Sequence, residues 1–146
     1  MCFLCSQSKA LRKLSFSMNR AHTMTYNDCS YCSEYEEIKC LPNHPEKLLV
    51  DVREQEELAE TGKIPTSINI PLDKVAEELG KGRTADEFKD KYGRKKPSAD
   101  TEIIFSCLKG RRSHQAAECA LQLGFKNVKS YEGSWEDWSK REALSN

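Results

Sequence analysis

Short apolar runs that alternate with segments of helical pattern are the feature that most constrains the fold of this chain. The expected strands are Lys47–Val52, a brief strand within Ile64–Pro71, Thr101–Ser106 and Asn127–Tyr131. The expected helices are residues 33–41, Glu54–Thr61, Asp73–Leu79, Thr84 to near Gly93, and Arg112–Leu123. Strands separated by helices favour right-handed crossovers. The pattern therefore predicts an α/β fold with a central parallel sheet of about five strands and helices on both faces.

Capping residues and glycines define the ends of the helices. Two pairs match the capping-box pattern, in which each side chain bonds the other residue's backbone N–H: Ser33 with Glu36, and Thr84 with Glu87. Glycines are expected to end other helices at Gly62, Gly80 and Gly124. These signals predict one folded domain over residues 29–146.

The first 28 residues are expected to form a leader outside this domain. Residues 1–24 are rich in Ser and basic, and no acidic residue comes before Asp28. Such a composition resembles a mitochondrial presequence, and the alternatives are a disordered tail or translated leader upstream of a start at Met24. We expect a mitochondrial location, with the cytoplasm as the alternative.

The balance of charges bears on the partners. The chain has 23 basic and 23 acidic residues, which argues against a nucleic-acid partner, and no apolar run approaches the ~20 residues needed to span a bilayer. We therefore expect a protein that binds neither nucleic acid nor membrane. We also expect a monomer. Seven cysteines, an odd number, indicate free thiols. The C-x-x-C pairs Cys2/Cys5 and Cys29/Cys32 lie too far apart for a usual zinc site.

The loop Cys107-Leu108-Lys109-Gly110-Arg111-Arg112 carries the expected chemistry. Cys107 follows the central strand directly, at the carboxyl edge of the sheet, where ligands bind in such folds. Gly110 allows a bend that turns backbone N–H groups toward one anion, and the next helix points its positive end there. The helix end and the cations Lys109, Arg111 and Arg112 predict a lowered pKa and a nucleophilic thiolate.

A thiolate in a cationic loop suits attack on the sulfur of an anionic donor, and the same loop would stabilise a persulfide on Cys107. We expect Cys107 to be the catalytic residue. The residues expected to bind the substrate are Leu108, Lys109, Gly110, Arg111 and Arg112.

Four segments resemble, in the same order, the motifs of the rhodanese-like domain family, and most of all its small animal single-domain members, the thiosulfate sulfurtransferase/rhodanese-like domain-containing proteins. The segments are Leu49–Arg53, Gly62–Pro71, Cys107–Ser113 and Tyr131–Trp138, within a span from Ser33 to Arg141. The chain departs from the family at Lys63, where members often carry His, and at Thr66, where they often carry Gly.

The resemblance implies a thiosulfate sulfurtransferase that needs no metal or other cofactor. The implied donor is thiosulfate, and the implied intermediate is a persulfide on Cys107. The implied acceptor is cyanide, glutathione or a protein thiol such as that of a thioredoxin-like protein.

Other functions use the same fold. A phosphatase or arsenate reductase of this type carries Arg six residues after Cys, whereas this chain has Ser113 there and Arg112 at five, which indicates a tighter loop. A persulfide carrier between proteins uses the same residues and differs only in its acceptor. A non-catalytic binding module would not require the intact Cys107.

Several residues near the loop are expected to support it. Asp51 and Arg53, at a strand end, are typical of buried hydrogen bonds that fix an adjacent helix and loop. Ser113 and Trp135 are expected to be structural as well. His114 is expected to be exposed and dispensable, because a thiolate already formed needs no base.

Overall fold

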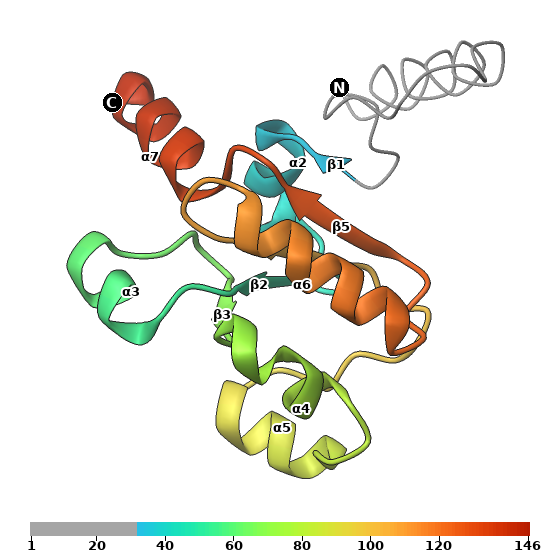
Figure 1. The fold of residues 1–146 in the computed structure, drawn as a ribbon. Coiled ribbons are helices and arrows are strands. Elements are labelled where there is room, and N and C mark those ends of the chain that lie inside the picture. Colours follow the sequence, from blue (N-terminus) through green and yellow to red (C-terminus); the bar gives the residue numbers. More distant parts are fainter. Residues whose placement is uncertain (1–31) are drawn as a thin grey trace, which may run out of the picture. The chain divides into compact units, whose positions relative to one another are not determined.

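A computed structural model describes residues 32–146, and five strands in this part of the chain form one sheet (Figure 1). The strands are β1 (Cys32–Ser33), β2 (Leu48–Asp51), β3 (Ile68–Asn69), β4 (Ile103–Ser106) and β5 (Val128–Tyr131). Their order is β1-β5-β4-β2-β3, and every neighbouring pair is parallel. The predicted parallel α/β sheet is confirmed, with β4 at its centre.

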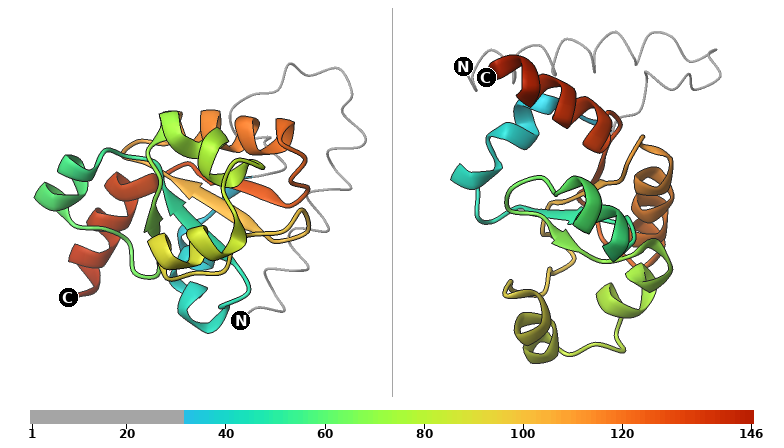
Figure 2. Two further views of the ribbon diagram at one scale, coloured as in Figure 1. Left: turned by 90° about the horizontal axis from the view of Figure 1, so that it is seen from below. Right: turned by 90° about the vertical axis from the view of Figure 1, so that its left-hand side faces the viewer.

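Helices cover both faces of this sheet, as predicted. The helices of the described residues are α2 (Tyr35–Lys39), α3 (Gln55–Thr61), α4 (Val75–Leu79), α5 (Ala85–Tyr92), α6 (Arg111–Gln122) and α7 (Ser134–Ser145), with 3-10 turns at Leu41–Asn43 and Leu72–Lys74. Of these, α3 has no buried residue. Successive side chains of a strand point to opposite faces, so Val50 packs in the core beneath α4, α5 and α6, and Leu49 packs in the core beneath α2 and α7. In the right-hand view of Figure 2, α6 and α2 lie on opposite sides of the strands.

The start of the domain differs from the predicted capping box at Ser33 and Glu36. Ser33 belongs to β1, where it pairs with Tyr131 of β5, and Glu34 precedes the first residue of α2. The Ser33 hydroxyl donates to the Glu37 carboxylate at 3.0 Å instead of capping the helix. Pairing with a neighbouring strand thus replaced a local capping interaction, and the prediction was wrong here.

Other predicted boundaries agree with the structure. The capping box of α5 is present, with the Thr84 N–H donating to the Glu87 carboxylate at 2.8 Å and the Glu87 N–H donating to the Thr84 hydroxyl at 3.2 Å. Gly62 follows the last residue of α3 directly. The helix expected over Asp73–Leu79 is divided, because a 3-10 turn precedes α4. The sequence pattern gave no expectation of α7.

The predicted leader, residues 1–28, lies outside the described residues, as do Cys2, Cys5 and Cys29 of the C-x-x-C pairs. Among residues 32–146, no three His, Cys, Asp or Glu side chains are arranged to hold a metal ion. Within the same range, no helix has the length and apolar character needed to cross a membrane.

Candidate active site

Cys107 lies immediately after β4, where the chain leaves the sheet and turns into α6. Its residue surface is only 1% exposed, and the backbone N–H of Gly110 donates a hydrogen bond to its sulfur at 3.0 Å. Gly110 makes this turn with φ of +98°, and a Cβ at this position would overlap the carbonyl oxygen of Glu132. Glycine is therefore required here for two reasons, the backbone angle and the close approach of another segment.

Two serine hydroxyls lie beside the sulfur. The Oγ of Ser113 is 3.6 Å from the Sγ of Cys107, and the Oγ of Ser134 is 3.7 Å from it. Each hydroxyl also donates to a nearby carbonyl oxygen, Ser113 to Gly110 at 2.9 Å and Ser134 to Tyr131 at 2.7 Å. Because a hydroxyl rotates about its C–O bond, each one is able to donate to a thiolate when the sulfur is ionised.

The pKa of Cys107 is lowered mainly by hydrogen bonds. Burial is the largest effect and raises the pKa, but hydrogen bonds from the backbone and hydroxyl of Ser113, the hydroxyl of Ser134 and the N–H of Gly110 outweigh it. The sequence pattern predicts that the helix end and three cations lower this pKa, and the backbone N–H groups of Gly110 and Ser113 lie at that helix start. None of the three cations is among the main causes. Neutral donors around the sulfur thus stabilise its ionised form.

The first turn of α7 holds the outer side of the loop. The backbone N–H of Trp135 donates to the carbonyl oxygen of Cys107 at 2.9 Å, and that of Glu136 donates to the carbonyl oxygen of Leu108 at 3.0 Å. The Ser134 hydroxyl accepts the N–H of Cys107 at 3.0 Å. Three consecutive residues of α7 therefore fix the backbone on which the sulfur is carried.

Asp51 and Arg53 form a buried pair at the end of β2. Both residues are 0% exposed, and the guanidinium of Arg53 donates to both carboxylate oxygens of Asp51 at 2.8 to 3.1 Å. Arg53 also donates to the Thr61 hydroxyl at 2.8 Å and to the Gly62 carbonyl at 3.0 Å. Its guanidinium lies 5.1 Å from the centre of the Trp135 ring. These contacts join the end of α3 to the start of α7. A supporting role for Asp51 and Arg53 stays a prediction.

The three cations predicted to bind substrate have different surroundings. Lys109 and Arg111 are exposed, whereas Arg112 is partly buried. Both terminal nitrogens of Arg112 donate to the carboxylate of Glu57 on α3, at 2.7 and 2.8 Å. This pair lowers the pKa of Glu57 to about 2, the hydrogen bond from Arg112 being the main cause. Arg112 is thus already bound to an anion of the protein itself.

The sequence pattern does not single out two residues of this site, Ser134 and Glu57. Ser134 lies within the quoted segment Tyr131–Trp138, but the pattern does not indicate that its hydroxyl reaches Cys107. Its backbone φ of +51° is unusual for a residue with a side chain, and such angles often occur at functional sites. The pattern predicts Glu57 only as part of an acidic helix. Folding alone brings it to Arg112.

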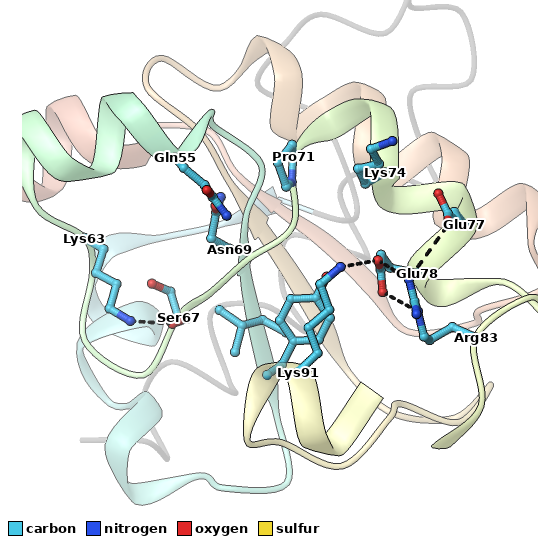
Figure 3. Close-up of a pocket in the computed structure, with 12 residues that line it drawn as sticks. Gln55, Lys63, Ser67, Asn69, Pro71, Lys74, Glu77, Glu78, Arg83 and Lys91 are labelled. Atoms are coloured by element: carbon cyan, nitrogen blue, oxygen red, sulfur yellow. Dashed lines mark hydrogen bonds and ion pairs between the residues drawn. The ribbon is translucent and has the colours of Figure 1, made fainter. Parts of the chain in front are cut away.

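A separate cavity of about 640 Å³ lies beside β3, lined by residues of α3, α4 and α5 and the chain around β3 (Figure 3). The carboxylate of Glu78 is buried in its wall and accepts hydrogen bonds from Arg83 at 2.8 and 2.9 Å and from Lys91 at 2.6 Å. Cys107 does not line this cavity. The Glu78 contacts fix α4 against α5 and the turn between them.

Comparison with known proteins places this geometry in a family. Residues 34–141 match the Rhodanese-like domain. This chain belongs to the rhodanese family. Its relatives in this family include the Drosophila melanogaster rhodanese domain-containing protein CG4456, which is 48% identical over 110 residues, 75% of this chain and 97% of the relative. The human thiosulfate:glutathione sulfurtransferase is 34% identical over 96 residues, 65% of this chain and 81% of that protein.

Solved rhodanese structures share the fold. The Saccharomyces cerevisiae single-domain sulfurtransferase RDL2 superposes with a TM-score of 0.65 at 34% identity, over 84% of this chain and 97% of that one. Its full name is thiosulfate sulfurtransferase RDL2, mitochondrial. The human single-domain sulfurtransferase TSTD1 superposes with a TM-score of 0.69 at 29% identity, over 77% of this chain and 98% of that one. The predicted rhodanese resemblance is confirmed.

Proposed function

We propose that this rhodanese is a thiosulfate sulfurtransferase that carries sulfane sulfur on Cys107. The observation that carries the proposal is the hydrogen bond from the Gly110 N–H to the Cys107 sulfur at 3.0 Å, with two serine hydroxyls beside it. Donors arranged around a sulfur stabilise its negative charge before and after transfer. The names of the yeast and human relatives, thiosulfate sulfurtransferase and thiosulfate:glutathione sulfurtransferase, support the same activity.

The first step loads the enzyme. The Cys107 thiolate attacks the outer sulfur of thiosulfate, a new S–S bond forms, and the bond between the two sulfurs of thiosulfate breaks. Sulfite leaves with the electron pair of that bond, and the negative charge of the persulfide lies on its outer sulfur. No proton transfer is needed in this step, so a dispensable His114 stays a prediction. Its side chain is 33% exposed and pairs with Glu118 at 3.6 Å, so it is less exposed than predicted.

The second step releases the sulfur to an acceptor. A thiolate of the acceptor attacks the outer persulfide sulfur, the Cys107 S–S bond breaks, and the Cys107 thiolate returns. Glutathione is the proposed acceptor, with support from the name of the human relative. Cyanide and a protein thiol such as that of a thioredoxin-like protein follow the same chemistry. A protein thiol as the only acceptor would make the protein a persulfide carrier.

Phosphatase or arsenate-reductase activity is less well supported. Such chemistry needs a guanidinium free to bind a tetrahedral oxyanion over the nucleophile. Here Arg112 comes five residues after Cys107 and both of its terminal nitrogens donate to Glu57. For location we propose the mitochondrion, with support from the name of yeast RDL2, and the cytoplasm as the alternative. A monomer remains our proposal for the oligomeric state.

Detection of the intermediate tests the proposal. After treatment with thiosulfate and removal of excess donor, intact-mass measurement should show one added sulfur on the wild-type protein and none on Cys107→Ser. Cys119→Ser is the matched control, because Cys119 lies on α6 away from the loop turn and should leave loading unchanged. A wild-type protein that gains no sulfur, or a Cys107→Ser variant that still does, would contradict the proposal. Competition among glutathione, cyanide and thioredoxin then identifies the acceptor.

A further inference from the structure

The carboxylate of Glu57, on α3, is paired with Arg112, the last of the three cations in the loop. Each terminal nitrogen of Arg112 donates one hydrogen bond to Glu57, at 2.7 and 2.8 Å. The side chains of both residues are 32% exposed, so the pair is partly shielded from water. Shielding strengthens the attraction and holds the pair together more firmly than a fully exposed one.

Glu57 is itself fixed in position by α3. It is the third residue of that helix, and its carboxylate accepts the backbone N–H of Glu54 at 2.9 Å in a capping box. One carboxylate oxygen therefore receives both Glu54 and Arg112, and the other receives Arg112 alone. The negative charge is held at this place by the fold and does not depend on a flexible side chain.

The other two loop cations are not neutralised in this way. Within residues 32–146, neither Lys109 nor Arg111 forms a salt bridge, and both side chains are exposed. An incoming anion thus meets two solvated cations, Lys109 and Arg111. At Arg112 it meets a guanidinium that already carries a carboxylate.

We propose that Glu57 is a specificity-determining residue that weakens the binding of doubly charged sulfur donors, so that the loop favours donors with a single negative charge. This inference rests on the proposed function and deepens it, because it names the residue that sets how strongly the loop prefers a singly charged donor over thiosulfate. A dianion such as thiosulfate competes with Glu57 for Arg112 and is repelled by it. A singly charged donor meets less repulsion from Glu57.

Two donors that differ in charge test the inference. Thiosulfate carries two negative charges, whereas methanethiosulfonate carries one and transfers its outer sulfur by the same attack, with methanesulfinate as the leaving group. In Glu57→Gln, kcat/KM for thiosulfate should rise about 5-fold through a lower KM, the size expected of one partly exposed ion pair. For methanethiosulfonate it should rise no more than about 2-fold, so the ratio of the two values changes.

Glu56→Gln is the matched control, because Glu56 is the preceding residue of α3, is exposed and does not contact Arg112. It removes the same charge and should leave the ratio unchanged. Gln at position 57 keeps an oxygen for the Glu54 N–H, so α3 should still form, and circular dichroism checks this. An unchanged donor ratio in Glu57→Gln, or an equal change in Glu56→Gln, would overturn the inference.

A binding measurement separates this inference from the proposed function. Calorimetric titration of thiosulfate into Cys107→Ser, with and without Glu57→Gln, reports affinity without sulfur transfer. Tighter binding in the double variant supports the role of Glu57 even if the wild-type protein forms no persulfide. Equal binding in both variants refutes the role of Glu57 while leaving persulfide formation to stand on its own measurement.

Discussion

The hydroxyl of Ser134 accepts the backbone N–H of Cys107 at 3.0 Å and lies 3.7 Å from its sulfur. One side chain thus fixes both the backbone and the reacting atom of the cysteine. It comes from the start of α7, 27 residues further along the chain.

Ser134→Ala is expected to raise the pKa of Cys107. The Ser134 hydroxyl is one of the groups that lower this pKa, and its loss leaves burial, which raises it, less opposed. The rate of alkylation by iodoacetamide, followed against pH, should therefore shift its midpoint to higher pH. Ser139→Ala, on the same helix but bonded only to the Glu136 carbonyl, should leave the midpoint where it is. Identical pH profiles for all three proteins would count against this role of Ser134.

Gly110→Ala should destabilise the protein by ~2–4 kcal/mol and abolish sulfur loading. An alanine would be strained at φ of +98°, and its Cβ would overlap the Glu132 carbonyl. Gly93→Ala provides the control, because Gly93 has φ of +68° but nothing within 4 Å of the added Cβ. It should lose only ~1 kcal/mol, from backbone strain alone. Urea unfolding measures both, and equal losses would show that the Glu132 contact is unimportant.

Arg53→Ala should lower the free energy of unfolding by ~3–5 kcal/mol, since it leaves the buried carboxylate of Asp51 without its partner. Arg141→Ala is the comparison. Arg141 pairs with Asp137 but its side chain is 52% exposed, so its loss should change stability by less than ~1 kcal/mol. The urea unfolding midpoints of the two variants and the wild type measure these losses of stability. Similar effects of the two substitutions on the free energy of unfolding would mean that burial of the Asp51–Arg53 pair does not increase its contribution to stability.

The Glu57 pair predicts a dependence of stability on pH. The pKa of Glu57 is about 2 in the folded protein, with the Arg112 hydrogen bond as the main cause, and ~4.3 for an unperturbed Glu in the unfolded chain. A lowered folded pKa adds stability above the unfolded pKa, and this stability is lost as the pH falls toward the folded value. Wild type should exceed Glu57→Gln by ~1 kcal/mol near neutral pH, and more than half of this should be lost by pH ~3. A difference independent of pH would argue against an ionic pair.

Local signals predicted the position of the cysteine but not its surroundings. The strand Ile103–Ser106, the glycine at position 110 and the helix after it are contiguous, so their pattern places Cys107 at the sheet edge. Glu57 and Arg112 are 55 residues apart, and only the packing of α3 beside the start of α6 brings them together. The two-residue strand β1 was likewise missed, because it forms only where β5 is available for pairing.

The cations illustrate the same limit in another way. Counting Lys109, Arg111 and Arg112 from the sequence suggests three charges directed at the sulfur. In the folded chain the effective donors are neutral, and they come from Gly110, Ser113 and Ser134. A sequence shows which charges are near in the chain, but not which of them another segment has already paired.

The bonds between the loop carbonyls and α7 make two amide protons useful reporters. The N–H groups of Trp135 and Glu136 belong to the first turn of a helix, where such groups have no partner within the helix, and they donate to Cys107 and Leu108. Their exchange with solvent deuterium therefore requires the loop to separate from the helix. The exchange rate of these two amides therefore measures how often the Cys107 loop separates from α7, in a protein that is carrying out no reaction at all.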